Sequence, residues 1–122
     1  MIGDVILVID DDTDFSELLE IALKHRKYEV VTEKNGEEGL KKAELIHPRL
    51  ILLDIKMPKM DGFTFVQHLK KNDKIKDIPV IILTGFEPMR DMFQLEGVAG
   101  YFVKTSDKKI LFQALEKLLE RK

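Results

Sequence analysis

Carboxylates, one hydroxyl and one ammonium stand where apolar runs of this sequence end, and their types could do chemistry together. The run Asp10 to Asp12 follows one apolar stretch and Asp54 follows another, while Thr84 and Lys104 end two later stretches. Carboxylates gathered at one place repel one another unless a cation lies among them or their pKa values rise. Mg²⁺ is the natural remedy, because it favours oxygen ligands and typically takes one or two carboxylates plus a phosphate oxygen.

This combination of groups is suited to phosphoryl transfer. An aspartate beside Mg²⁺ can attack a phosphoryl group, since the metal offsets charge on the transferring oxygens while a lysine and a hydroxyl hold the rest. The residue types therefore predict an aspartyl-phosphate site.

Each of these residues also has a purely structural explanation. Asp12 or Thr13 can cap a helix, and we assign capping to one of these two and chemistry to the preceding pair. Asp54 can be a strand-ending turn residue, Thr84 can satisfy a strand end, and Lys104 can be an ordinary solvated lysine. Their joint placement at four strand ends favours the site.

The elements that must position these residues follow from the spacing of apolar side chains. Five short apolar runs predict strands, several of them buried on both faces: Val5 to Ile9, Tyr28 to Thr32, Leu50 to Leu53, Val80 to Leu83 and Ala99 to Val103. Helical spacing predicts helices around 15–23, 40–46, 65–69 and 110–119, with a further one over Met89 to Leu95. Strands and helices that alternate predict an α/β fold, a doubly wound parallel sheet with helices on both faces. Ligands bind such sheets outside the carboxyl ends of the strands, where the polar residues stand.

Composition limits the classes of function. The 122 residues carry a net charge of −2 and no cysteine, which excludes thiol chemistry and gives no global field for nucleic acid. No apolar run approaches the roughly 20 residues that a membrane span needs. We expect one domain over residues 1–122, soluble and cytoplasmic, with no direct nucleic-acid contact and no membrane insertion.

Two segments resemble the receiver domains of two-component response regulators. The pair Asp10-Asp11 after Val5 to Ile9 is similar to the acidic pair of that family, and Asp54 to Gly62 reads as its phosphoacceptor segment, D-x-x-M-P-x-x-D-G. Thr84, Lys104 and Tyr101 fall where the family has its phosphate-binding hydroxyl, its lysine and its switch aromatic. The resemblance runs from about Asp4 to the end of the chain and is closest to single-domain, chemotaxis-type regulators.

The resemblance implies a flavodoxin-like sheet with strand order 2-1-3-4-5 and a phosphoacceptor switch rather than an enzyme. Asp54 would accept the phosphoryl group from a histidine kinase or phosphotransfer protein, and a downstream protein effector would read the result. It implies that Mg²⁺ is bound by Asp11, Asp54 and the backbone carbonyl of Lys56, with Asp10 acting through a metal-bound water. It also implies that Thr84 and Lys104 hold the phosphoryl oxygens, and that Thr84 and Tyr101 carry the switch.

The sequence departs from the family pattern in two places. Thr105 stands where a proline usually follows the lysine, and the stretch from Thr84 to Gly97 is about two residues short and contains Pro88. We further expect the Phe86 ring to cover the site and slow hydrolysis of the phosphoryl group. With no effector domain following, the chain would act through protein contacts, free-standing or as a phosphorelay carrier, unless it is a piece of a longer protein.

Two alternative functions use the same residues. A Mg²⁺-dependent phosphohydrolase would share the aspartyl-phosphate chemistry, although 122 residues leave no segment for a substrate lid. A degenerate receiver that only binds partners would have lost Asp11, Asp54, Thr84 or Lys104, and all four are present.

Overall fold

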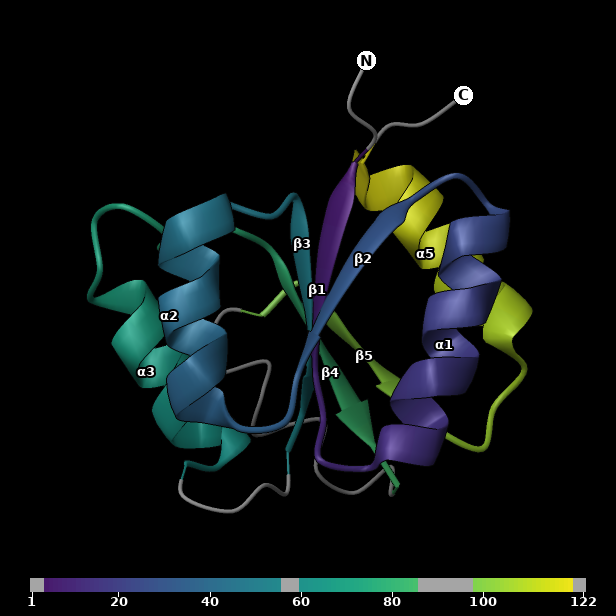
Figure 1. Ribbon diagram of the computed structural model, residues 1–122, viewed down its shortest axis with the longest axis horizontal. Helices are drawn as coiled ribbons and strands as arrows, with labels where there is room; N and C mark the ends of the chain where they lie inside the picture. The colour runs from purple at the N-terminus through teal and green to yellow at the C-terminus, as the bar shows by residue number, and fades with distance from the viewer. Residues whose placement is uncertain (1–3, 56–59, 86–97, 120–122) are drawn as a thin grey trace.

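A five-stranded parallel sheet forms the centre of the molecule (Figure 1). The computed structural model describes residues 4–55, 60–85 and 98–119. The strands are ordered β2-β1-β3-β4-β5 and every pair is parallel. They span Val5–Ile9 (β1), Glu29–Glu33 (β2), Leu50–Asp54 (β3), Val80–Thr84 (β4) and Gly100–Val103 (β5). The predicted fold class and strand order are confirmed.

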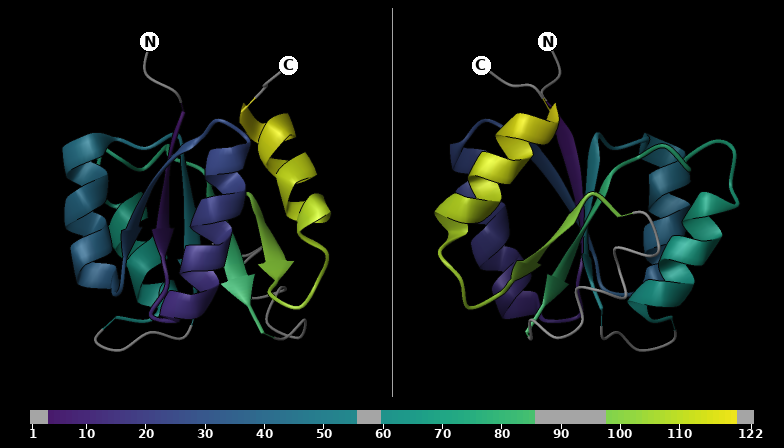
Figure 2. Two further views of the ribbon diagram at one scale, coloured as in Figure 1. Left: turned by 45° about the vertical axis from the view of Figure 1, so that its right-hand side comes forward. Right: turned by 180° about the vertical axis from the view of Figure 1, so that it is seen from behind.

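Helices cover both faces of the sheet (Figure 2). They are α1 (Thr13–His25), α2 (Gly36–Ile46), α3 (Gly62–Lys70) and α5 (Lys108–Leu119). Helices α1 and α5 pack on one face, and α2 and α3 pack on the other. The helix predicted over Met89 to Leu95 lies outside the described residues.

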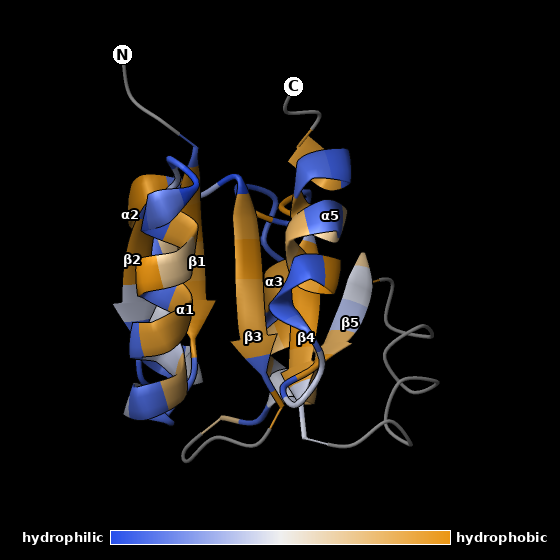
Figure 3. Ribbon diagram, turned by 90° about the vertical axis from the view of Figure 1, so that its right-hand side faces the viewer, coloured by the Kyte–Doolittle hydropathy of each residue, from blue (hydrophilic) through white to orange (hydrophobic). Residues whose placement is uncertain are grey.

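The apolar residues of each strand alternate between two hydrophobic cores. Ile6 and Val8 of β1 belong to the core beneath α1 and α5, whereas Leu7 and Ile9 belong to the core beneath α2 and α3. Strands β3 and β4 are buried throughout, as is β1 after Val5, while β2 and β5 form the edges and are partly exposed. Figure 3 shows that the central strands are apolar, whereas the helices beside them mix apolar and polar residues. Each fully buried aliphatic side chain contributes about 1.5–3 kcal/mol to the stability of the fold. The central strands therefore give the site a rigid base.

Side-chain caps fix where three helices begin. Asp12 accepts from the Phe15 amide at 3.1 Å, Asn35 from the Glu38 amide at 2.9 Å and Asp61 from the Thr64 amide at 2.8 Å. The capping role predicted for Asp12 or Thr13 thus belongs to Asp12. Because α1 begins two residues beyond Asp11, the Asp10-Asp11 pair stays at the sheet edge.

Two strands start one residue later than the apolar pattern predicts. The Tyr28 amide donates to the Leu23 carbonyl at 3.2 Å and so closes the end of α1, which leaves β2 to begin at Glu29. Strand β5 begins at Gly100, directly after Ala99 donates to the Val80 carbonyl at 2.8 Å. At the other end, β3 and β4 include Asp54 and Thr84 as their last residues.

Candidate functional site

Strand register brings the polar strand ends together at the carboxyl edge of the sheet. Ile9 lies opposite Leu53, so the residues that follow them, Asp10 and Asp54, are neighbours across β1 and β3. On the other side Thr84 lies opposite Val103, which places Lys104 one residue beyond the end of β5. This is the lower edge of the sheet in Figure 1, where the strand arrows end.

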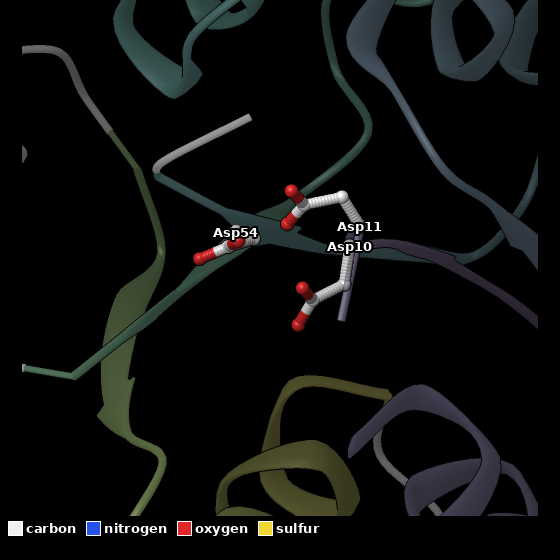
Figure 4. A group of neighbouring side chains, drawn as sticks. All are labelled: Asp10, Asp11 and Asp54. Atoms are coloured by element: carbon white, nitrogen blue, oxygen red, sulfur yellow. The ribbon is translucent and has the colours of Figure 1, made fainter. Parts of the chain in front are cut away.

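Three carboxylates converge at this edge. One oxygen atom from each of Asp10, Asp11 and Asp54 lies within 4.8 Å of the other two. Figure 4 shows Asp10 and Asp11 approaching from the end of β1 and Asp54 from the end of β3. Asp10 and Asp54 are only 1% and 6% exposed, whereas Asp11 is exposed at the mouth of the site. The predicted acidic cluster is therefore present in the structure.

Lys104 supplies an ammonium to this cluster. Its Nζ lies 2.8 Å from Asp10 Oδ2 and 3.6 Å from Asp54 Oδ1, and its side chain is 18% exposed. The Lys104 amide also donates to the Thr84 carbonyl at 2.8 Å, which anchors the lysine to the end of β4. Among the described residues this is the cation paired with these carboxylates, so the group remains rich in negative charge.

The pKa of Asp54 responds to this surplus. Burial and the negative charge of Asp10 raise the pKa of Asp54 from 3.8 to about 7. A hydrogen bond between the Asp54 and Asp10 side chains and the charge of Asp11 add to the shift, and the Lys104 ammonium opposes it. Near neutral pH, Asp54 therefore carries a proton in a large share of molecules that have no bound cation.

The pKa of Lys104 moves in the direction expected for a paired cation. Burial by itself would lower the pKa of Lys104, but contact with Asp10 and the charges of Asp10, Asp54 and Asp12 outweigh it and raise the pKa above 10.5. The lysine therefore stays charged at physiological pH.

A Mg²⁺ ion fits this donor set. Asp10 Oδ1 accepts the Asp12 amide at 2.9 Å, whereas the buried Asp10 Oδ2 is paired with the Lys104 charge but has no well-aligned hydrogen-bond donor among the described residues. The cluster offers oxygen ligands only, which suits Mg²⁺ better than a softer metal. The Lys56 carbonyl, implied as a further ligand, lies outside the described residues, as does Phe86.

The two predicted switch residues lie on one face of the sheet. Thr84 is 1% exposed, and Tyr101 is half-buried against the core beneath α2 and α3. Tyr101 pairs with Ile82, two residues before Thr84, so the two side chains are diagonal neighbours on adjacent strands. This register is compatible with direct coupling between them.

One residue at the site, Phe15, was not foreseen from the sequence. The spacing of apolar residues identified Phe15 only as part of the apolar face of α1. In the structure, its ring centroid lies 4.8 Å from Lys104 Nζ and 5.6 Å from Lys108 Nζ. Periodicity could not reveal these contacts, because they depend on how α1 and α5 sit beside the end of β5.

Comparison with known proteins shows which family the chain belongs to. The family model described as "Response regulator receiver domain" matches residues 6–116. The chain belongs to this family. It is 42% identical to the probable transcriptional regulator ycf27 of Cyanophora paradoxa over 118 residues. These residues make up 95% of this chain and 48% of that protein. It is 36% identical to the DNA-binding dual master transcriptional regulator RpaA of Synechocystis over 95% of this chain and 49% of that protein. The receiver domain thus spans about half the length of these regulators.

A solved structure with the same fold is the response regulator TrrA of Thermotoga maritima, determined in complex with Mg²⁺ and BeF. It is 35% identical to this chain with a TM-score of 0.86, covering 94% of this chain and 98% of TrrA. The predicted family and two-component context are confirmed. Among the described residues of this receiver domain, no helix is both long and apolar enough to cross a membrane.

Replacing Asp54 by asparagine should stabilise the receiver domain at about pH 8 without divalent cations, because it removes a disfavoured buried charge. A carboxyl with a raised folded-state pKa holds its proton more tightly folded than unfolded. Ionising Asp54 therefore costs stability progressively as the pH rises from 3.8 through about 7. We expect urea unfolding to show a gain of about 1–2 kcal/mol at about pH 8, allowing for partial solvent screening, and a much smaller gain near pH 4.

Asp77→Asn is the matched control, since it makes the same chemical change at an exposed position. It should leave the free energy of unfolding nearly unchanged at both pH values. If Asp54→Asn gave the same gain near pH 4 as at about pH 8, the raised pKa of Asp54 would be wrong.

Proposed function

We propose that this receiver domain accepts a phosphoryl group on Asp54, with Mg²⁺, and then switches a protein-interaction surface. The observation that carries the proposal is the position of the Asp54 carboxylate, held at the sheet edge within 4.8 Å of two other carboxylates and 3.6 Å from the Lys104 ammonium. The donor would be a phosphohistidine on a histidine kinase or phosphotransfer protein, as in other two-component systems.

Asp54 is the nucleophile in this proposal. One of its carboxylate oxygens forms a bond to phosphorus while the bond between phosphorus and the donor nitrogen breaks, and that nitrogen keeps the electron pair and takes up a proton. Only the ionised carboxylate can attack, so the proton that Asp54 holds near neutral pH must leave first. A cation bound among the carboxylates favours that loss.

Lys104 and Thr84 hold the transferred group. The Lys104 ammonium already lies between Asp10 and Asp54, where it can neutralise a phosphoryl oxygen attached to Asp54. The Thr84 hydroxyl stands at the end of the neighbouring strand and can donate to another phosphoryl oxygen. Both residues are anchored by the backbone bond from the Lys104 amide to the Thr84 carbonyl.

The chain's own carboxylates would hold Mg²⁺. Asp11, exposed at the mouth, and Asp54 would bind it directly and the buried Asp10 would act from behind, with the Lys56 carbonyl implied by the family. When bound, the ion offsets the negative charge that gathers on the phosphoryl oxygens.

The output surface we propose includes β5 and α5. Phosphorylation adds up to about two negative charges and new acceptor oxygens, which should draw Thr84 and Lys104 inward. Tyr101 can then turn into the space behind Thr84. The neighbouring helix α5 exposes Ile110 at 59% and Leu118 at 39%, which a protein partner can cover. The domain would act as a switch that promotes its own phosphorylation and dephosphorylation, rather than as an enzyme on free substrates.

Incubation with acetyl phosphate and Mg²⁺ should add one phosphoryl group to the wild-type chain, detected by intact-protein mass spectrometry. Asp54→Asn should abolish the addition, because it removes the nucleophile. Asp11→Ala should also abolish it, because it removes a metal ligand. Asp77→Asn should be modified like the wild type.

Two outcomes would contradict the proposed function. One is a phosphoryl group that persists on the Asp54→Asn chain. The other is sustained turnover of a phosphate monoester such as p-nitrophenyl phosphate, which would favour a phosphohydrolase.

A beryllofluoride mimic with Mg²⁺ should shift the Tyr101 ring resonances in the wild-type chain. In Thr84→Ala the mimic should still bind, but the shift of the Tyr101 resonances should be much smaller. Alanine has no hydroxyl that the mimic can draw inward, so no space opens for the Tyr101 ring. To invert the equilibrium between the two positions of the Tyr101 ring from 1:99 to 99:1, the mimic would have to stabilise one position over the other by about 5.5 kcal/mol. We therefore expect only part of the population to change position. Equal ring shifts in both proteins, or none in either, would show that Thr84 and Tyr101 are not coupled.

A further inference from the structure

The Phe15 ring closes a circuit of contacts around the site. Lys104 pairs with Asp10 at 2.8 Å, Asp10 accepts the Asp12 amide at 2.9 Å, and Asp12 accepts the Phe15 amide at 3.1 Å. The circuit is completed by Lys104 Nζ, which lies 4.8 Å from the Phe15 ring centroid. Ammonium groups within about 6 Å of an aromatic centroid are attracted to the face of the ring.

The ring itself is held firmly. Phe15 lies in the first turn of α1, where the Asp12 cap fixes its backbone. Its side chain packs against the core beneath α1 and α5. The ring therefore provides a fixed surface, whereas Lys104 has a long side chain with many rotamers.

An ammonium is constrained differently by a ring face than by a carboxylate. A carboxylate fixes the ammonium along its lone pairs, whereas a ring face attracts the charge over a broad area. Over the ring, the Lys104 ammonium can move between Asp10 Oδ2 at 2.8 Å and the oxygens of Asp54, the nearer at 3.6 Å, while it remains within the site. Such movement is what a phosphoryl group arriving on Asp54 would require.

We propose that Phe15 is a positioning residue, whose ring holds the Lys104 ammonium between Asp10 and Asp54 and thereby sets how fast Asp54 is phosphorylated. This inference rests on the proposed function for its kinetic consequence, although the positioning of Lys104 can be measured without it. Lys108 approaches the same ring from farther away, at 5.6 Å, and is the outer of the two cations.

Three variants separate the ring's electrostatic role from its packing. Phe15→Leu keeps an apolar side chain but removes the ring face. Phe15→Tyr restores a ring face, and Lys108→Met removes the outer cation while leaving ring and lysine in place. Circular dichroism and urea unfolding establish that each variant is folded.

The first measurement is the side-chain NMR spectrum of Lys104 in the unphosphorylated chain. In the wild type its methylene protons near Nζ should carry an upfield ring-current shift, which Phe15→Tyr and Lys108→Met should retain. In Phe15→Leu the relaxation of the Lys104 side chain should show that it is more mobile than in the wild type. The second is the initial rate of phosphorylation by acetyl phosphate with Mg²⁺. Phe15→Leu should lower this rate by about threefold to tenfold, Phe15→Tyr should recover most of it, and Lys108→Met should match the wild type.

The two measurements also distinguish this inference from the proposed function. A Lys104 side chain that is no more mobile in Phe15→Leu than in the wild type overturns the positioning role. Equal rates of phosphorylation in these two chains, or an equal loss of rate in Phe15→Leu and Phe15→Tyr, overturn the kinetic role of the Phe15 ring. A wild-type chain that takes no phosphoryl group overturns the proposed function and the kinetic role of Phe15, while the Lys104 spectrum still decides whether the ring positions the lysine.

Discussion

Repulsion among carboxylates at the end of the sheet is the constraint on which the site depends. Asp10 and Asp54 are buried side by side because β1 and β3 are adjacent and in register, and Asp11 lies within 4.8 Å of both. Among the described contacts one ammonium, that of Lys104, opposes this charge, and the pKa of Asp54 stays raised to about 7. Such an arrangement is stable only if a proton or a cation makes up the difference. In the function we propose, the same surplus of charge would attract a metal ion and make its binding depend on pH.

The surrounding fold keeps this unfavourable group in place. Three central strands, apolar along almost all of their length, form a base between two hydrophobic cores, so the polar strand ends have little freedom to move apart. The Asp12 cap starts α1 immediately behind the acidic pair, and Gly62 lets α3 begin against the end of β3, where an added Cβ would lie 3.0 Å from the Ile55 Cα. Stability elsewhere thus compensates for charge repulsion at the site, as is common for functional sites.

Much of this was predictable because it follows from periodicity and from strand-end chemistry. The apolar runs gave the strands to within a residue, and the polar residue at each strand end identified Asp10, Asp54, Thr84 and Lys104 as a group. Details that depend on three-dimensional packing were not predictable. The 2.8 Å pairing of Lys104 with Asp10 depends on side-chain rotamers, and the Phe15 contact depends on how α1 lies beside β5. The late start of β2 came from the Tyr28 amide, which closes α1 instead of joining the strand.

Proton release on Mg²⁺ binding tests most directly whether charge repulsion governs the site. Calorimetric titrations in buffers of different ionisation enthalpy count the protons released per bound ion, since metal binding requires deprotonated ligands. With the pKa of Asp54 near 7, we expect close to one proton per Mg²⁺ at about pH 6 and close to none at about pH 8.5. Asp54→Asn should show no such pH dependence in whatever Mg²⁺ binding it retains. Mg²⁺ binding to the wild-type chain without proton release at about pH 6, or with the same release at both pH values, would contradict the account.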